Sequence, residues 1–192
     1  MKRLVKFIPN SITLSRIGLS ILFITNVTGQ FVYGKNNFIT LIVVFSTICL
    51  TDLIDGRIAK KIRCISATGA KLDVFADLFF IVVSNITLIR LKILPPWFLG
   101  FIVFKFLEFT MTSNFTIRHN YLPVKHVFVF DRIGRIVSAM FFVVPGAACI
   151  FQVLAPDIAE GLIISTLYAI LAGGILSSCL RVKGCLKLIS FN

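Results

Sequence analysis

Long apolar runs alternate with short polar segments along this chain and predict its secondary structure. The runs cover roughly residues 11–32, 38–50, 72–89, 97–118, 136–154 and a stretch that ends near residue 180. A helix that crosses a bilayer needs about 20 predominantly apolar residues, and most of these runs approach that length. The pattern predicts an all-α integral membrane protein with about six transmembrane helices and a short N-terminal amphipathic segment, forming a single domain over residues 1–192.

Prolines and charges predict where these helices begin and end. Pro9 and Asn10 suit a helix start, so the basic segment 1–6 is expected to lie separately on the membrane surface. The N-terminus has the basic start and apolar run of a signal peptide, but Arg16 interrupts the run, and we expect a retained first helix. Further predictions are loops at 57–71 and 118–135, a break at 91–96, an internal break at Pro145–Gly146 and an acidic turn at 156–160.

Composition agrees with a membrane location. Hydrophobic residues make up 57% of the chain and charged residues 15%, with a mean hydropathy of +0.96. A soluble domain would carry about 25% charged residues. The net charge of +12 would suit nucleic acid, but the chain offers no soluble basic domain to carry it. We therefore expect no nucleic-acid partner and assign the charge to a face that meets anionic lipid headgroups and phosphorylated substrates.

Lysine and arginine are concentrated in alternate segments between the apolar runs. Both termini and the predicted loops at 57–71 and 118–135 are basic, whereas the other connections carry few cations. Because cytoplasmic loops carry an excess of lysine and arginine, both termini are expected on the cytoplasmic side. The pattern predicts a multi-pass protein of the cell membrane in which the segment 52–77 faces the cytoplasm.

Four of the 8 acidic residues lie close together in the sequence: Asp52, Asp55, Asp73 and Asp77. On helices, spacings of three and four residues put each pair on one face, with Cβ atoms about 5–6 Å apart. Ionisable groups at membrane depth are costly and by default mark function, and clustered carboxylates need a cation to neutralise them. Oxygen ligands favour a hard ion, Mg²⁺ first and Mn²⁺ or Ca²⁺ behind it, and this many carboxylates favour two ions over one.

The spacing D-x2-D-G-x2-A-K-x8-G-x3-D-x3-D in this segment resembles the signature of the CDP-alcohol phosphotransferase family. The matching positions are Asp52, Asp55, Gly56, Ala59, Gly69, Asp73 and Asp77, and Lys60 stands where the family usually has arginine. The resemblance implies a homodimeric membrane enzyme that transfers a phosphatidyl group from CDP-diacylglycerol to an alcohol acceptor and releases CMP. It further implies that Asp52, Asp55 and Asp73 are metal ligands. Asp77 would be the general base, with a contact to the metal as well.

We predict that the nucleotide is bound by residues of the first helix and of the signature: Asn10, Thr13, Gly56, Ala59, Lys60 and Gly69. Gly56 leaves room for the nucleotide, and the other small residues suit close contact, although small residues are also ordinary packing devices in membranes. Lys60 can hold a phosphate as a point charge but lacks the planar two-pronged contact of arginine. For Asn10 and Thr13, a helix cap and a hydroxyl bonded within its own helix are equally good explanations. Arg16, on the same flank of the first helix, is a candidate for facing the nucleotide or the metal site, and snorkelling to the surface is the alternative.

Cations near the later helices are predicted to bind a phosphorylated acceptor: Arg118, Arg132, Arg135 and Arg181. Positive-inside topology alone explains these cations equally well. The chain length, the P-N-x-x-T-x-x-R opening and this cluster resemble bacterial phosphatidylglycerophosphate synthases, which implies glycerol 3-phosphate as the acceptor. Those enzymes usually have L-D-P-x-A-D-K where this chain has L-D-V-F-A-D-L, so serine and inositol phosphate stay open as acceptors.

A non-enzymatic alternative is a membrane metal-binding or transport protein, which would also place acidic residues on apolar helices. Nothing in that function requires small residues at the spacings seen here. An inactive relative acting as a scaffold is a further alternative, and the presence of all four aspartates argues against it. Outside the signature, Lys105 and Glu108 lie three residues apart in an apolar run and predict a salt bridge within the membrane.

Overall fold

The computed structural model describes the backbone of residues 2–62, 67–119 and 127–190, and the side chains of residues 14–52, 72, 74–112, 134 and 136–183. Six α-helices occupy this backbone: α1 (Lys2–Phe31), α2 (Phe38–Ile62), α3 (Ala67–Arg90), α4 (Pro96–His119), α5 (Val127–Leu154) and α6 (Pro156–Ser190). The predicted all-α class and the six helices are confirmed.

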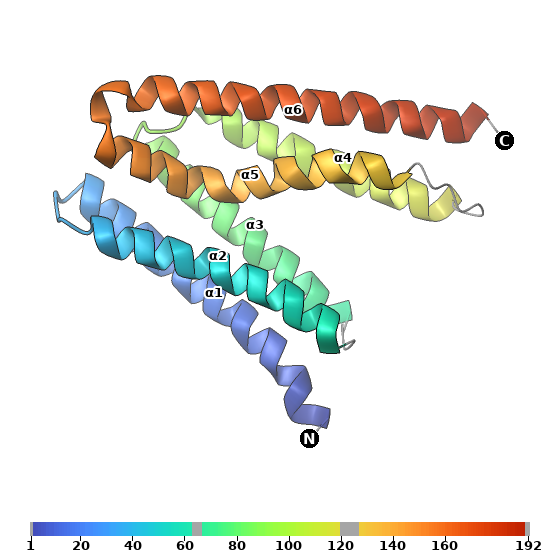
Figure 1. Ribbon diagram of the computed structural model, residues 1–192, viewed down its shortest axis with the longest axis horizontal. Coiled ribbons are helices and arrows are strands. Elements are labelled where there is room, and N and C mark those ends of the chain that lie inside the picture. The colour runs from blue at the N-terminus through green and yellow to red at the C-terminus, as the bar shows by residue number, and fades with distance from the viewer. Residues whose placement is uncertain (1, 63–66, 120–126, 191–192) are drawn as a thin grey trace.

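Successive helices run in opposite directions (Figure 1). The connections from α1 to α2, from α3 to α4 and from α5 to α6 lie at one end of the bundle. Both chain termini and the C-terminal ends of α2 and α4 lie at the other end, where α1 and α2 diverge from α6. The segments that carry most of the lysines and arginines therefore share one end, as the predicted topology requires.

Helix α3 lies in the middle of the bundle, in contact with α1, α4 and α5, while α5 pairs with α6 and α1 with α2. Its Phe80 is fully buried, with the ring centroid 5.5 Å from that of Phe23 on α1 and 4.8 Å from that of Phe142 on α5. Aromatic pairs of this kind add about 0.5–1.5 kcal/mol beyond the area that they bury. The Phe80 contacts therefore join the first half of the chain to the second.

The end of α3 explains the predicted break between the third and fourth apolar runs. The Lys92 N–H donates to the Ile89 carbonyl (3.0 Å), and the Ile93 N–H donates to the Leu88 carbonyl (2.9 Å). Lys92 adopts a left-handed conformation with φ of 59°. Together these features form a Schellman motif, which satisfies carbonyl groups that the end of a helix leaves open. Two prolines follow, α4 begins at the second of them, and the predicted break is confirmed.

Several helices are longer than the hydropathy pattern predicts. Helix α1 begins at Lys2 and is continuous through Pro9, so the separate surface segment at 1–6 and the helix start at Pro9 are wrong. A charge ends an apolar run, but the backbone groups beyond it still gain from helical hydrogen bonds, and long basic side chains can reach the headgroups. The same cause explains three further corrections. Residues 57–62 and 67–71 are helical although a loop was predicted there, and α5 already starts at Val127, within the other predicted loop. Helix α6 includes the predicted turn at 156–160 and continues to Ser190.

The predicted internal break at Pro145–Gly146 is also wrong, because α5 continues through it to Leu154. A proline removes one backbone hydrogen bond from a helix interior, and neighbouring helices make this tolerable in membrane bundles. Gly146 serves packing: a Cβ at this position would lie 2.3 Å from the ring of Phe45 on α2. Gly146 therefore lets α2 lie close to α5, and Pro145 does not end the helix.

Two segments among the described helices are long and apolar enough to cross a membrane, Ile136–Leu154 and Pro156–Lys183, and Phe38–Asp52 is apolar but shorter. Large apolar side chains also point outward from the bundle, for example Ile39 at 77% and Met111 at 73% exposed. An apolar surface of this kind suits contact with lipid. These features indicate a membrane protein, while the six spans and their orientation stay predictions.

Candidate functional site

A fully buried arginine joins the first three helices. Arg16 of α1 has 0% of its side chain exposed, and its Nη1 lies 2.5 Å from Asp77 Oδ1 of α3. The same nitrogen lies 3.4 Å from Asp52 Oδ1 of α2. A charge removed from solvent is tolerated when it is paired in this way. The first and last aspartates of the signature are therefore held at one guanidinium group.

The two carboxylates remain accessible although the arginine is covered. The side chains of Asp52 and Asp77 are 41% and 32% exposed. One turn along α1 from Arg16, the buried Ser20 hydroxyl donates to the Arg16 carbonyl (2.7 Å), which satisfies this hydroxyl within the helix. Of the two alternatives for Arg16, snorkelling to the surface is wrong, because its side chain turns into the bundle toward two carboxylates of the predicted metal site.

The other two aspartates of the signature lie on the same helices. Asp55 belongs to α2 and Asp73 to α3, three residues from Asp52 and four residues from Asp77 respectively. Such spacings put each residue on the same helix face as its neighbour. The side chains of Asp55 and Asp73 lie outside the described part of the structure, so their convergence with the other two stays a prediction.

Asp52 and Asp77 offer carboxylate oxygens, the donors that Mg²⁺ and Mn²⁺ prefer. They come from two helices, meet at one nitrogen and are partly exposed, so donor type, convergence and access fit a divalent cation. Among the side chains that the structure describes, no three candidate ligands come together. The set of four ligands and the pair of ions therefore stay predictions.

The predicted nucleotide-binding residues lie on α1, α2 and α3, outside the described side chains: Asn10, Thr13, Gly56, Ala59, Lys60 and Gly69. On the helical backbone, Asn10 and Thr13 precede Arg16 at intervals of three residues, so the three share one flank of α1. At Arg16 this flank faces α2 and α3. The roles of the six residues stay predictions.

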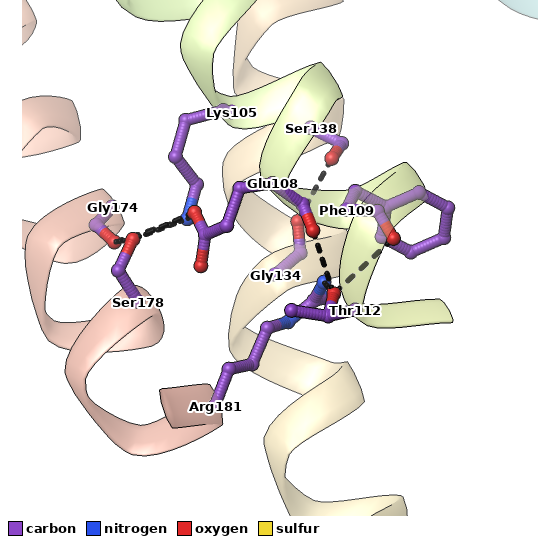
Figure 2. Close-up of polar contacts among 9 residues, drawn as sticks. All are labelled: Lys105, Glu108, Phe109, Thr112, Gly134, Ser138, Gly174, Ser178 and Arg181. Atoms are coloured by element: carbon purple, nitrogen blue, oxygen red, sulfur yellow. Dashed lines mark hydrogen bonds and ion pairs between the residues drawn. The ribbon is translucent and has the colours of Figure 1, made fainter. Parts of the chain in front are cut away.

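Of the four predicted acceptor residues, Arg181 has a described side chain, which lies where α4, α5 and α6 meet (Figure 2). Its Nη1 donates to Thr112 Oγ1 of α4 (3.2 Å), and its Cζ lies 5.0 Å from the centre of the Phe109 ring. Gly134 of α5 lies against the same group, since a Cβ there would be 2.6 Å from Nη2. Arg181 is therefore half-buried and held by residues of α4 and α5, and does not simply extend to the surface.

Arg118, Arg132 and Arg135 lie outside the described side chains. Gly134 adjoins Arg135 and follows Arg132 by two residues, so the Arg181 guanidinium reaches the segment of α5 that carries both. Arg118 belongs to the last turn of α4, beyond the threonine that Arg181 contacts. The backbone thus brings the four cations to one end of α4, α5 and α6, and their joint action on an acceptor stays a prediction.

The predicted Lys105–Glu108 salt bridge is confirmed, with 2.7 Å between Nζ and Oε2. The Ser178 hydroxyl of α6 donates to the same Oε2 (2.7 Å), and Lys105 Nζ also donates to the Gly174 carbonyl (3.2 Å). Figure 2 shows these groups meeting between α4 and α6. The salt bridge, predicted from neighbours on one helix, therefore also fastens two helices together.

Three residues that matter to these sites were missed from the sequence: Thr112, Gly134 and Ser178. Arg16 was a candidate from the sequence, because a cation inside an apolar run, in register with Asn10 and Thr13, is costly unless it is used, but its two partners were not predicted. The others are small residues without a charge or a motif, and only the packing of α4, α5 and α6 shows what they touch.

Comparison with known proteins agrees with the signature. The sequence model of the CDP-alcohol phosphatidyltransferase family matches residues 6–173. The chain is 34% identical over 123 residues to the probable cardiolipin synthase (CMP-forming) of Drosophila melanogaster, a match that covers 63% of this chain and 36% of that protein. It is 27% identical over 115 residues to the CDP-diacylglycerol–glycerol-3-phosphate 3-phosphatidyltransferase of Bacillus subtilis (strain 168), covering 55% of this chain and 58% of that protein. The chain thus matches less than two thirds of the length of either relative.

Proposed function

Because this chain belongs to the CDP-alcohol phosphatidyltransferase family, we propose that it transfers a phosphatidyl group from CDP-diacylglycerol to an alcohol and releases CMP, as a step of phospholipid biosynthesis. One observation carries the proposal beyond the family. The first and last aspartates of the signature meet at the buried Arg16 while their own side chains stay 41% and 32% exposed. This arrangement holds two carboxylates together and leaves them open to a ligand.

In the proposed reaction, the acceptor hydroxyl attacks the phosphorus that carries the diacylglycerol. Asp77 takes the hydroxyl proton as the new phosphorus–oxygen bond forms. The bond from this phosphorus to the bridging oxygen of the pyrophosphate breaks, and CMP leaves with that oxygen and the electron pair. A positioned general base contributes typically about 10²–10⁴-fold to such a rate.

Arg16 acts on Asp77 in this scheme. Its contact with one carboxylate oxygen fixes the orientation of the side chain. Asp52, Asp55 and Asp73 would hold one or two divalent cations, which when bound neutralise charge on the leaving phosphate and orient the phosphorus for in-line attack. Chelation should therefore abolish turnover, and Mg²⁺ or Mn²⁺ should restore it.

We propose glycerol 3-phosphate as the acceptor. Arg181 and the basic segment of α5 that it contacts would meet the acceptor phosphate, and the name of the Bacillus subtilis relative includes this acceptor. Serine and inositol phosphate remain alternatives with the same bond chemistry. The 34% identity to a Drosophila protein named as a cardiolipin synthase supports a second candidate, in which phosphatidylglycerol is the acceptor.

An acceptor panel tests the proposal. The chain, reconstituted in lipid nanodiscs with CDP-diacylglycerol and Mg²⁺, would receive one labelled acceptor at a time: glycerol 3-phosphate, serine, inositol phosphate or phosphatidylglycerol. We expect CMP release and a labelled lipid with glycerol 3-phosphate. CMP release with another acceptor alone would show that glycerol 3-phosphate is not the acceptor, while the proposed transferase activity would stand. No CMP release with any of them would favour a metal-binding or transport protein.

We also propose that the end of the bundle with both termini faces the cytoplasm, because most of the lysines and arginines lie there. Cys185, near the C-terminus, should then react with a membrane-impermeant thiol reagent from the cytoplasmic side alone. Reaction from the outside alone would reverse the orientation. The homodimer that the family implies stays a prediction, which the mass of the particle in nanodiscs would test.

A further inference from the structure

Arg181 is held from α4 by two neighbouring residues (Figure 2). Its Nη1 donates to the Thr112 hydroxyl (3.2 Å), and that hydroxyl is fixed in turn because it donates to the Glu108 carbonyl (2.7 Å). The Phe109 ring lies 5.0 Å from the guanidinium carbon, within the range of a cation–π contact. These contacts set both the position and the tilt of the guanidinium plane.

Gly134 of α5 lies against the Arg181 guanidinium from a third side. A Cβ at this position would lie 2.6 Å from Arg181 Nη2 and 3.4 Å from its Cζ, distances at which one group has to move. A long arginine side chain usually swings aside at little cost, but here the swing would break the contacts with Thr112 and Phe109. Glycine inside a helix costs about 1 kcal/mol relative to alanine, so a packing reason for Gly134 is expected.

The helix that carries Arg181 is anchored about one turn away. Ser178 accepts a hydrogen bond from Lys105 (3.0 Å) and donates to Glu108 (2.7 Å). A shift of α6 that relieved crowding at Gly134 would break this buried contact with α4. A larger residue at Gly134 would therefore displace the Arg181 side chain and leave the helices in place.

We propose that Gly134 is a positioning residue that sets where Arg181 presents its charge, with Thr112 fixing the orientation from α4. The inference rests on the proposed function, in which Arg181 binds the phosphate of the acceptor. Charge-assisted hydrogen bonds to a phosphate depend on direction and distance, so a displaced guanidinium would bind the acceptor more weakly. The substitution is on α5 and Asp77 is on α3, so the proposed base itself would be unchanged.

The test compares Gly134→Ala with Gly173→Ala, both in nanodiscs. At Gly173 of α6 a Cβ would meet Val137 Cγ2 at 3.8 Å, an ordinary contact, so this control makes the same chemical change without touching Arg181. We expect Gly134→Ala to raise the KM for glycerol 3-phosphate about 10-fold. The kcat and the KM for CDP-diacylglycerol should stay within about twofold of the unmodified chain. The Gly173→Ala variant should leave all three values unchanged.

A double variant shows whether Gly134 acts through Arg181. If it does, Gly134→Ala combined with Arg181→Ala should have the acceptor KM of Arg181→Ala alone, because the effects of coupled residues do not add. Additive effects would overturn the inference, and so would an unchanged acceptor KM in Gly134→Ala. If Gly134→Ala does not fold, Thr112→Val takes its place, and we expect it to raise the acceptor KM about 3- to 10-fold. An unchanged acceptor KM in Thr112→Val would then overturn the inference.

The same measurements separate this inference from the proposed function. If Arg181→Ala alone leaves the KM for glycerol 3-phosphate unchanged, the acceptor role of Arg181 fails, and the positioning role fails with it. If Arg181→Ala raises the KM but neither Gly134→Ala nor Thr112→Val does so, the acceptor role stands and only the positioning role is overturned.

Discussion

In the Arg16 cluster the cation is fully buried, while Asp52 and Asp77 keep 41% and 32% of their side chains exposed. In the Lys105–Glu108 pair both partners are buried, at 9% and 11% exposed. The first cluster joins three helices through residues that lie far apart in the sequence. The second is built on neighbouring turns of α4 and is closed by a hydroxyl from α6.

The difference distinguishes a ligand site from a structural contact. Glu108 Oε2 already accepts from Lys105 and Ser178 inside the bundle, so a ligand has no access to it. Asp52 and Asp77 are anchored by a covered cation and still reach a surface where a ligand can bind them. Both clusters offset the cost of charge in an apolar bundle. The exposure of the acid, more than the presence of an ion pair, therefore indicates which charged residues of a membrane helix carry function.

The largest effect should come from removing the proposed base. Asp77→Asn keeps the size of the side chain but cannot take a proton, so the rate of CMP release should fall by about 10²–10⁴-fold. Asp157→Asn is the control, because Asp157 is an exposed acid in the first turn of α6, at the opposite end of the bundle. Turnover retained in Asp77→Asn would remove Asp77 from the role of base.

Breaking the Lys105–Glu108 pair should lower the free energy of unfolding. Glu108→Gln leaves Lys105 buried without its carboxylate, and loss of one partner of a buried pair costs about 3–5 kcal/mol. The midpoint of thermal unfolding in detergent would measure this loss. Replacing both residues, Lys105→Met with Glu108→Leu, leaves no unpaired charge and should recover most of the stability. If Glu108→Gln unfolds at the same temperature as the unmodified chain, the pair is not a structural contact.

Substitution of Arg16 should have an intermediate effect on turnover. Arg16→Lys keeps the charge but loses the planar group that reaches two carboxylates, so we expect about 10-fold slower CMP release, and about 100-fold for Arg16→Gln. Arg90→Lys makes the same change at an exposed position in the last turn of α3 and should be neutral. Equal rates for Arg16→Lys and Arg90→Lys would show that a single charge is enough at this site.

The smallest effect is expected at Lys60, whose side chain lies outside the described part of the structure. Lys60→Arg restores the residue usual for the family and offers a phosphate a two-pronged contact. The KM for CDP-diacylglycerol should fall by no more than about fivefold, with kcat little changed. A loss of activity would mean that the surrounding pocket is adapted to lysine.

The sequence by itself determined the six helices, the break between α3 and α4, the spacing of the aspartates and the Lys105–Glu108 pair. Each of these depends on near neighbours: an apolar run is long enough to span, and residues three or four apart share a helix face. The helix ends were less predictable. Hydropathy falls at the first charge, whereas backbone hydrogen bonding continues through the basic and acidic segments that flank the apolar runs.

The tertiary structure decided which charged and small residues meet. Arg16 lies 61 positions from Asp77, and Arg181 lies 69 positions from Thr112. Whether such residues touch depends on the rotation of each helix about its axis and on its offset along its neighbours. Those quantities come from the packing of the whole core, including the contact of Phe80 with Phe142. A local pattern places a residue on a helix, and only the packed bundle determines what that residue faces.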